Sequence, residues 1–335
     1  MKKFNIAVLG ATGAVGQEML KVLSEYDIPV EKLLPLGSAR SAGRKILFKG
    51  QEIEVQEATD ESFWGMDFVL GAVEGDMSRR FAPAIKASGA VYIDNSSAFR
   101  LDPEVPLVVP EVNGADAFEN KGVIANPNCC TIIALMAVAG IEKLSRIEKM
   151  VVCTYQAVSG AGQNGIAELE SQMKALAAGE KPEVKTFAAQ IALNVIPFID
   201  APYGNDYSKE EMKMQNEGRK ILHDPELKVN CTCVRVPVMR SHSIAVTLRT
   251  EKKLDLEEVK KAVASFPGCR RIEDYEGRCY PTPLDTTDQY LVWVGRIRQD
   301  LTDDNGITLW CCGDQIRKGA ASNAVQILKL LAEKR

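Results

Sequence analysis

A cysteine between a turn and an apolar run is the residue of this sequence best suited to chemistry. Cys129 follows Asn126-Pro127-Asn128, and the apolar residues Ile132–Met136 after it predict a helix that starts near the cysteine. Unpaired N–H groups and the positive end of the helix dipole meet at such a start, and both favour a thiolate. Because thiolates attack carbonyl carbons, we predict that Cys129 is a nucleophile rather than a buried structural thiol.

Glycine spacing near the N-terminus supplies a second chemical signal. Gly10, Gly13 and Gly16 stand where the predicted strand Lys3–Leu9 gives way to the predicted helix Ala14–Glu25. Backbone N–H groups of such a loop bind the pyrophosphate of a dinucleotide, and a Cβ would block the approach. A hydride carrier and a thiolate in one protein indicate redox chemistry on an acyl group.

The loop after the second predicted strand, Lys32–Leu36, indicates which dinucleotide is bound. Proteins that bind NAD often carry an acidic residue there for the ribose 2′-hydroxyl. This loop instead contains Ser38, Arg40 and Ser41 and lacks Asp or Glu. Hydroxyl and guanidinium groups suit a 2′-phosphate, so we predict NADP. Arg44, further along, is more typical of a solvated surface charge.

Only two histidines are available as proton shuttles. His223 stands at the end of a predicted helix and before Asp224-Pro225, which is typical of a solvated position. His242 lies in a loop that joins two predicted strands, and an imidazole there could titrate near neutral pH. Spacing alone leaves open whether His242 is catalytic.

Three cationic side chains are candidates for anion binding, although each could also be an ordinary surface charge. Arg100 follows the predicted strand Ala90–Asp94, and Arg235 lies on the strand that leads toward His242. Nothing in the spacing singles out Lys213.

Composition excludes several classes of protein. The 335 residues have a net charge of −4, with 46% hydrophobic and 26% charged residues, which is typical of a soluble globular protein of about two domains. A nucleic-acid binder would have a basic domain. The start Met1–Leu9 fits a strand better than a signal peptide, because it ends at Gly10 without a cleavage site. Ile132–Ile141 is too short to span a bilayer, so we expect a cytoplasmic protein without a membrane partner.

Nine cysteines give no sign of a metal site. No two form a Cys-x-x-Cys pair, and two histidines are few to supplement them. We expect a reducing compartment in which most of the thiols are buried and inert. Cys130 is expected to point elsewhere on the helix than Cys129 and to pack in the core.

Strands alternate with helices in the first part of the chain, which predicts a parallel sheet with right-handed crossovers. Longer strands follow Cys129 and predict an α+β domain on a mixed or antiparallel sheet. The further strands expected are Asp67–Val73, Leu107–Val109, Val123–Ala125, Lys149–Gln156, Lys228–Val238, Ser243–Thr250, Gln289–Arg298 and Gly306–Cys312. The further helices expected are Asp76–Ala87, Gly165–Ala177, Lys209–Leu222, Asp255–Ala264 and Lys318–Lys334.

The fold class is therefore α/β, with a Rossmann-type NADP-binding domain and an α+β catalytic and dimerisation domain. We expect the first domain to comprise residues 1–128 with 314–335, because the last helix should pack back on it, and the second to comprise 129–313. The sheet of the second domain needs a partner to cover it, which predicts a homodimer.

Six segments, in this order, resemble those of the aspartate-β-semialdehyde dehydrogenase family over the whole chain: residues 10–16, 95–100, 126–129, 156–162, 235–243 and 314–321. The approach Arg235-Val236-Pro237-Val238 to His242 is similar to the Gram-positive type. One departure is Cys130, where many members carry Ser or Thr.

The resemblance implies a role for each candidate residue. Cys129 would be the nucleophile, His242 the acid/base catalyst and Gln156 the residue that orients the substrate. The remaining substrate contacts would be Arg235 on the carboxylate, Glu210 nearby, and Arg100 and Lys213 on the leaving phosphate. Together with the residues singled out above, the cofactor contacts would be Gly10, Thr12, Gly13, Ala14, Val15, Gly16, Ser38, Arg40, Ser41, Ser159, Gly160 and Gln315.

The implied reaction is the NADPH-dependent reductive dephosphorylation of L-aspartyl-4-phosphate to L-aspartate-4-semialdehyde, through a thioester, in lysine/diaminopimelate, threonine and methionine biosynthesis. Aspartyl phosphate and phosphate would be the small-molecule partners. An N-acetyl-γ-glutamyl-phosphate reductase is the alternative enzyme, but its cysteine usually follows Pro-Gly, which this chain lacks. A non-catalytic NADP-binding paralogue should have lost the nucleophile or the histidine, and Cys129 and His242 are both present.

Overall fold

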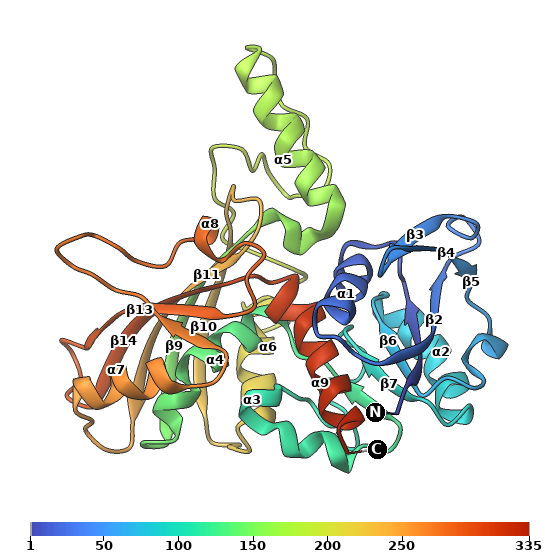
Figure 1. Ribbon diagram of the computed structural model, residues 1–335. Helices are drawn as coiled ribbons and strands as arrows, with labels where there is room; N and C mark the ends of the chain where they lie inside the picture. The colour runs from blue at the N-terminus through green and yellow to red at the C-terminus, as the bar shows by residue number, and fades with distance from the viewer. Residues whose placement is uncertain (1, 335) are drawn as a thin grey trace. The chain divides into compact units, whose positions relative to one another are not determined.

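The computed structural model describes residues 2–334, and these form two compact units. The first unit comprises the chain up to Asn128 and from Ala320 onward, and the second unit is Cys129–Gly319. Residues 314–319, which the sequence analysis placed in the first domain, thus remain in the second unit. Each unit carries its own six-stranded sheet (Figure 1).

The sheet of the first unit is wholly parallel, with strand order β5-β2-β1-β6-β7-β8. This order matches the dinucleotide-binding arrangement 3-2-1-4-5-6. The strands are β1 (Phe4–Leu9), β2 (Val30–Gly37), β5 (Gln56–Glu57), β6 (Phe68–Gly71), β7 (Val91–Asp94) and β8 (Val123–Ala125). The helices are α1 (Ala14–Glu25), α2 (Gly75–Ala87), α3 (Pro110–Asn113) and α9 (Ser322–Ala332), with 3-10 turns at Asp60–Phe63 and Gly114–Glu119.

The first unit differs from the sequence prediction in several details, among them the unpredicted short elements β5 and α3. Leu107–Val109 is no strand, because only Leu107 bridges to Ala125 and α3 begins directly afterwards. A hairpin of β3 (Lys45–Phe48) and β4 (Gln51–Glu54) was not predicted, because its strands are only four residues long and its apolar run, Ile46–Phe48, is short.

The last helix belongs to the first unit, as its amphipathic pattern predicts. A π-helical turn, Arg317–Ala321, precedes it where a continuous α-helix was expected. The Nδ2 of Asn323 donates to the carbonyl of Val108 at 2.9 Å and to Oδ1 of Asn126 at 2.7 Å. These bonds tie α9 to the segment that leads to Cys129.

The second unit has a mixed sheet of order β10-β9-β11-β14-β13-β12. Its two end pairs are parallel and its three central pairings are antiparallel. The strands are β9 (Ile147–Gln156), β10 (Lys228–Arg235), β11 (His242–Thr250), β12 (Cys269–Arg271), β13 (Val292–Gln299) and β14 (Gly306–Gly313). The helices are α4 (Cys129–Glu142), α5 (Gly162–Ala177), α6 (Lys209–Ile221), α7 (Leu256–Ser265) and α8 (Pro283–Thr286), with a 3-10 turn at Val158–Ala161.

Helices α4, α6 and α7 pack against the sheet of the second unit, and α5 projects from it (Figure 1). Along β9 the side chains alternate, so Met150 and Val152 are buried while Val151 and Tyr155 are exposed on the opposite side. The ring of Tyr155 lies 5.4 Å from that of Trp310 on β14. On this side of the sheet Val151 and Tyr155 remain exposed within the described chain.

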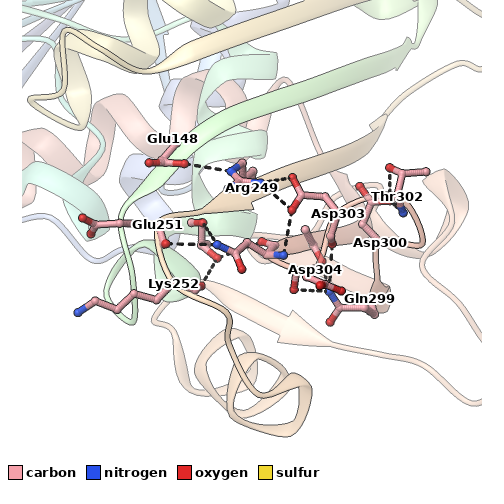
Figure 2. Close-up of polar contacts among 12 residues, drawn as sticks. Glu148, Arg249, Glu251, Lys252, Gln299, Asp300, Thr302, Asp303 and Asp304 are labelled. Atoms are coloured by element: carbon pink, nitrogen blue, oxygen red, sulfur yellow. Dashed lines mark hydrogen bonds and ion pairs between the residues drawn. The ribbon is translucent and has the colours of Figure 1, made fainter.

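A cluster of charged side chains holds the end of the sheet where β11 meets the turn between β13 and β14 (Figure 2). Arg249 donates to Glu148 at 3.1 Å and to both carboxylate oxygens of Asp303 at 2.6 and 2.7 Å. Asp300 caps the turn by accepting from the backbone and hydroxyl of Thr302. No helix within residues 2–334 is both long enough and apolar enough to cross a membrane.

Candidate active site

Cys129 is the first residue of α4, as its position after the turn predicted. Helix α4 is apolar on all sides and almost wholly buried, which fixes the position of its N-terminus. The cysteine itself is partly exposed. Gly319 lies against it, and a Cβ at Gly319 would stand 2.9 Å from the Cβ of Cys129. A side chain at position 319 would therefore displace the nucleophile.

Two thiols and one imidazole meet at this helix start. The Sγ atoms of Cys129 and Cys130 and a ring nitrogen of His242 all lie within 4.8 Å of one another. Cys130 was expected to point elsewhere on the helix and to pack in the core, and the first of these expectations is wrong. Cys130 is 1% exposed, yet its sulfur belongs to the reactive cluster.

The pKa of the Cys129 thiol lies well below its ordinary value. A hydrogen bond with Cys130 makes the largest contribution, and His242 lowers the pKa further, while burial and the Glu210 carboxylate oppose the shift. Burial, together with the charge on Cys129, raises the pKa of Cys130 well above the ordinary value. Cys130 therefore keeps its proton and donates it to a thiolate on Cys129.

The backbone fixes the orientation of His242. This residue starts β11 and is fully buried, and its Nδ1 accepts a hydrogen bond from the N–H of Ala157 at 3.0 Å. An Nδ1 that accepts leaves the proton of a neutral ring on Nε2. Nε2 makes no hydrogen bond to another described residue and is the nitrogen available to the thiols. A protonated Nε2 is a donor and not a metal ligand, so the cluster suits proton chemistry better than metal binding.

Arg235 ends β10 beside the same segment. Its Nη1 donates to the carbonyl of Ala157 at 2.6 Å, its side chain is 7% exposed, and burial lowers its pKa. Gly160 leaves room for it, because a Cβ there would lie 2.7 Å from Nη1 of Arg235 and 3.3 Å from Cε1 of His242. A guanidinium and an imidazole thus face one glycine, as a small anionic substrate would require.

Gln156, Glu210 and Lys213 form a chain of polar contacts. Gln156 accepts from the hydroxyl of Thr154 at 3.0 Å and donates to Oε1 of Glu210 at 3.2 Å. Oε2 of Glu210 accepts from Nζ of Lys213 at 2.8 Å. The two oxygens of one buried carboxylate therefore connect the end of β9 to helix α6.

A capping box sets the start of α6 and with it the place of Glu210. Glu211 donates its backbone N–H to the hydroxyl of Ser208 at 3.2 Å, and its carboxylate accepts from the N–H of Ser208 at 2.7 Å. Helix α6 begins at Lys209, as the sequence analysis expected, and the pattern Ser-x-x-Glu is a further signal for this start. Burial opposes the charge of Lys213, but Glu210 and Asp200 together raise its pKa above the ordinary value.

Gln315 lies between two segments of the second unit. Its Oε1 accepts from the N–H of Ser241 at 2.8 Å, and its Nε2 donates to the hydroxyl of Ser159. Ser159, Gly160 and Gln315 were predicted as cofactor contacts, and the structure brings all three to the His242 segment. The predicted residues that gather in the second unit are Cys129, Gln156, Ser159, Gly160, Glu210, Lys213, Arg235, His242 and Gln315.

The glycine loop of the first unit is shaped for a close backbone approach. Gly10 has φ +87°, and a Cβ there would lie 2.4 Å from the carbonyl oxygen of Ala72. A Cβ at Gly16 would lie 2.2 Å from the oxygen of Gly10, whereas one at Gly13 would meet nothing nearer than 3.5 Å. Gly13 precedes α1 as its N-cap and offers no side chain to cap it, so the first N–H groups of that helix remain available to an anion. The loop fits a pyrophosphate.

The turn after β2 carries the groups predicted to choose the dinucleotide. Arg40 is exposed and makes no ion pair or hydrogen bond with any other residue in the described range. Ser38 is exposed beside it. Ser41 is 7% exposed and directs its hydroxyl to the carbonyl of Ser38 at 3.0 Å, over Gly37. Arg40 is thus free to meet a phosphate, while the hydroxyls of Ser38 and Ser41 lie 3.5 Å apart within the turn.

Arg100 also lies in the first unit and is 8% exposed. Its Nε donates to the carbonyl of Asn126 at 2.9 Å, and its Nη2 donates to that of Asn95 at 2.9 Å. The guanidinium therefore joins the loop after β7 to the turn before Cys129. His223, the other histidine, is exposed after α6, where the sequence placed a solvated residue.

Comparison with known proteins assigns both units. Residues 5–120 match the family model described as semialdehyde dehydrogenase, NAD binding domain, and residues 138–318 match the semialdehyde dehydrogenase dimerisation domain. An aspartate-semialdehyde dehydrogenase of Synechocystis sp. is 45% identical over 329 residues, which cover 98% of this chain and 97% of the relative.

Solved structures agree with this assignment. The crystal structure of aspartate semialdehyde dehydrogenase II from Vibrio cholerae, complexed with ASA, has a TM-score of 0.97 at 43% identity and covers 99% of both chains. An aspartate semialdehyde dehydrogenase from Candida albicans, solved with NADP, has a TM-score of 0.78 at 25% identity and covers 99% of both chains.

Proposed function

Because the chain belongs to the aspartate-semialdehyde dehydrogenase family, we propose that it reduces L-aspartyl-4-phosphate to L-aspartate-4-semialdehyde and phosphate with NADPH. The reaction would serve lysine/diaminopimelate, threonine and methionine biosynthesis. One observation carries the proposal: a thiol of lowered pKa at a helix start, beside a buried imidazole whose free nitrogen faces it.

Covalent catalysis by Cys129 divides the reaction into two easier steps. The thiolate attacks the acyl carbon, the bond to phosphate breaks, and a thioester forms on Cys129. NADPH, when bound, supplies the hydride that reduces this thioester. The resulting thiohemiacetal on Cys129 then collapses to the aldehyde and returns the thiolate. The N–H groups of the first turn of α4 are placed to stabilise the oxyanion that develops at the acyl carbon.

His242 handles protons and hydrogen bonds at the sulfur. Its Nε2–H stabilises negative charge on Cys129 at rest and again when the thiolate leaves. Cys130 supplies a second donor to the same sulfur. General acid/base help is typically worth about 10²–10⁴-fold in rate, so loss of His242 should cripple turnover without abolishing it.

Arg235 and Glu210 recognise the amino-acid part of the substrate. The guanidinium can grip a carboxylate with two parallel hydrogen bonds, and the carboxylate of Glu210 lies on the same side of the unit. Gln156 is held by Thr154 and Glu210 in one orientation and positions the acyl group. Lys213 uses two of its three donors on Glu210 and Asp200, so one remains for the leaving phosphate, with Arg100 as its second ligand.

NADP would be held by the loop from Gly10 to Gly16, including Thr12, Ala14 and Val15, with Ser38 and Arg40 on the 2′-phosphate. Ser41 would contribute through its backbone. Ser159, Gly160 and Gln315 would contact the nicotinamide half from the second unit.

We further propose a cytoplasmic homodimer. All nine cysteines are free, which suits a reducing compartment. The dimerisation domain leaves Val151 and Tyr155 of its sheet exposed, and a second copy would cover them. The domain boundaries of this proposal are those of the two compact units, with the catalytic unit at Cys129–Gly319.

The decisive test is NADPH oxidation with aspartyl phosphate, by wild type and by Cys129→Ala. We expect wild-type turnover, and a loss of at least ~10⁴-fold in the variant with unchanged NADPH binding. Assays in the reverse direction, with phosphate and either aspartate semialdehyde or N-acetylglutamate semialdehyde, separate the two related reductases. Equal turnover of wild type and variant would overturn the assignment of the nucleophile.

A further inference from the structure

Residues 314–319 contact the surroundings of both catalytic side chains. Gln315 bonds to Ser241, the residue directly before His242, and Gly319 packs against Cys129. The segment also closes on itself, because the N–H of Gly319 donates to the carbonyl of Asp314 at 3.0 Å. A short stretch of chain thus spans the distance from the imidazole to the thiol.

Ser241 has an unfavourable backbone conformation that something must hold. Its φ is +73°, in the left-handed region that residues with a side chain rarely adopt, and it is fully buried. Its N–H would be an unsatisfied buried donor without Gln315, whose Oε1 accepts it at 2.8 Å. One bond therefore both satisfies the backbone and retains the strained turn into β11.

The other end of the same amide restrains the opposite flank of His242. Nε2 of Gln315 donates to the hydroxyl of Ser159, in the 3-10 turn that follows Ala157. Ala157 is the residue whose N–H fixes Nδ1 of the imidazole. Gln315 consequently bridges the two segments between which the ring of His242 is held.

Asp314 adds a contact to Arg240, the residue directly before Ser241. Nε of Arg240 lies 2.8 Å from Oδ2 of Asp314, which is fully buried. Oδ1 of Asp314 accepts the N–H groups of Ile316 and Arg317 at 2.9 and 3.1 Å. A buried carboxylate with this many partners is rigid, so the backbone next to Gln315 is held in place.

We propose that Gln315 is a positioning residue for His242: its amide clamps Ser241 to Ser159 and so aims the imidazole at Cys129. This role rests on the proposed function only for its kinetic readout. It goes beyond a contact with the cofactor, because both polar atoms of the amide already bind the protein.

The test compares Gln315→Met with Gln299→Met. Methionine has nearly the same length and lacks the amide, so the first variant removes both bonds. Gln299 is a matched control, since its Nε2 donates to the carbonyls of Asp304 and Gly306 at the far end of the sheet. Ser159→Ala removes only one bond of the clamp and serves as the milder variant if Gln315→Met fails to fold.

We expect Gln315→Met to lower kcat roughly tenfold or more, as part of the 10²–10⁴-fold range of acid/base help, with the KM for NADPH changed less than about threefold. Mass spectrometry can follow the rate at which iodoacetamide alkylates Cys129 at a series of pH values. The pH at which this rate is half-maximal should rise, because His242 no longer points directly at the thiol. Gln299→Met should leave both readouts unchanged.

A rise in the KM for NADPH with kcat and the alkylation profile unchanged would overturn the proposal and make Gln315 a cofactor ligand only. Unchanged values in all three measurements would overturn it as well. Because alkylation needs neither substrate nor cofactor, a shifted profile in a protein that fails to turn over aspartyl phosphate would uphold the clamp while refuting the proposed reaction.

Discussion

The second unit contains two networks of charged and polar side chains that differ in their access to water. Around Arg249, at the end of the sheet, the paired side chains of Glu148, Asp303 and Arg249 are 41%, 28% and 44% exposed (Figure 2). Around Glu210 the carboxylate is 8% exposed and the Lys213 side chain 23%. Both networks use short contacts between opposite charges, between 2.6 and 3.1 Å.

Water gives these similar contacts different consequences. Solvent and salt screen the Arg249 network, so each pair contributes little and the group mainly shapes a turn. The Glu210 network is shielded from water, so its charges act strongly on each other and on their neighbours. Removing one partner therefore leaves a buried charge unpaired. Burial therefore separates charges that support the fold from the charges that we propose bind the substrate.

Among changes in the buried candidate site, loss of the His242 imidazole should have the largest effect. His242→Ala removes the donor that faces Cys129, and we expect kcat to fall about 10²–10⁴-fold. His223→Ala is the matched control, because His223 is exposed after α6. Comparable losses in the two variants would mean that position 242 has no special place in the reaction.

Arg235→Lys should have the second-largest effect. Lysine keeps the positive charge but cannot offer two parallel hydrogen bonds or the contact to the Ala157 carbonyl in the same geometry. We expect the KM for aspartyl phosphate to rise about tenfold or more with a smaller effect on kcat, measured by steady-state NADPH oxidation. Arg249→Lys tests the same change in the exposed network and should leave KM alone. Equal KM values for Arg235→Lys and wild type would remove Arg235 from the substrate site.

Cys130→Ala should give an intermediate effect on the thiol itself. Without the neighbouring S–H donor, the pKa of Cys129 rises toward its ordinary value, so alkylation of Cys129 at neutral pH becomes slower. Cys130→Ser keeps a donor and should restore most of the rate. Cys279→Ala, an exposed thiol, is the control. If alanine and serine at position 130 react alike, the hydrogen bond to Cys129 has no influence on its ionisation.

The smallest effect is expected in the exposed network. Arg249 lowers the pKa of Asp303 in the folded protein, so this pair stabilises the fold above the ordinary pKa of aspartate and loses that effect as the pH falls through the lowered value. Asp303→Asn should therefore lower the melting temperature by at most a few degrees at pH 7, and the difference should shrink in high salt and as the pH falls below the ordinary pKa of aspartate. A large loss at neutral pH would show that exposure does not weaken this network.

Much of the first unit could be predicted from the sequence because its signals are local. A glycine loop between an apolar strand and a helix specifies its own geometry, and helix α1 has the bounds that the pattern indicated. The β3–β4 hairpin was missed because its strands are four residues long and mostly exposed, which is too short a stretch to show a period of two.

The candidate site was harder to predict because its contacts join residues far apart in the chain. Glu210 meets Gln156 across 54 positions, and Gln315 meets Ser159 across 156. No periodicity encodes such meetings, and only the resemblance to a family suggested them. The position of Cys130 beside Cys129 was mispredicted, because the pattern shows a neighbour on the helix but not the direction of its sulfur.

The contact between Cys129 and Gly319 has an architectural consequence. These are the first and last residues of the second unit, so that unit leaves and rejoins the remainder of the chain at adjacent points, as an inserted domain does. The Cys129 sulfur therefore lies where the chain enters the second unit. Lengthening the chain by even one residue at either junction would shift the sulfur before it disturbed either sheet, so insertions that are harmless at most domain borders should be lethal to turnover at this one.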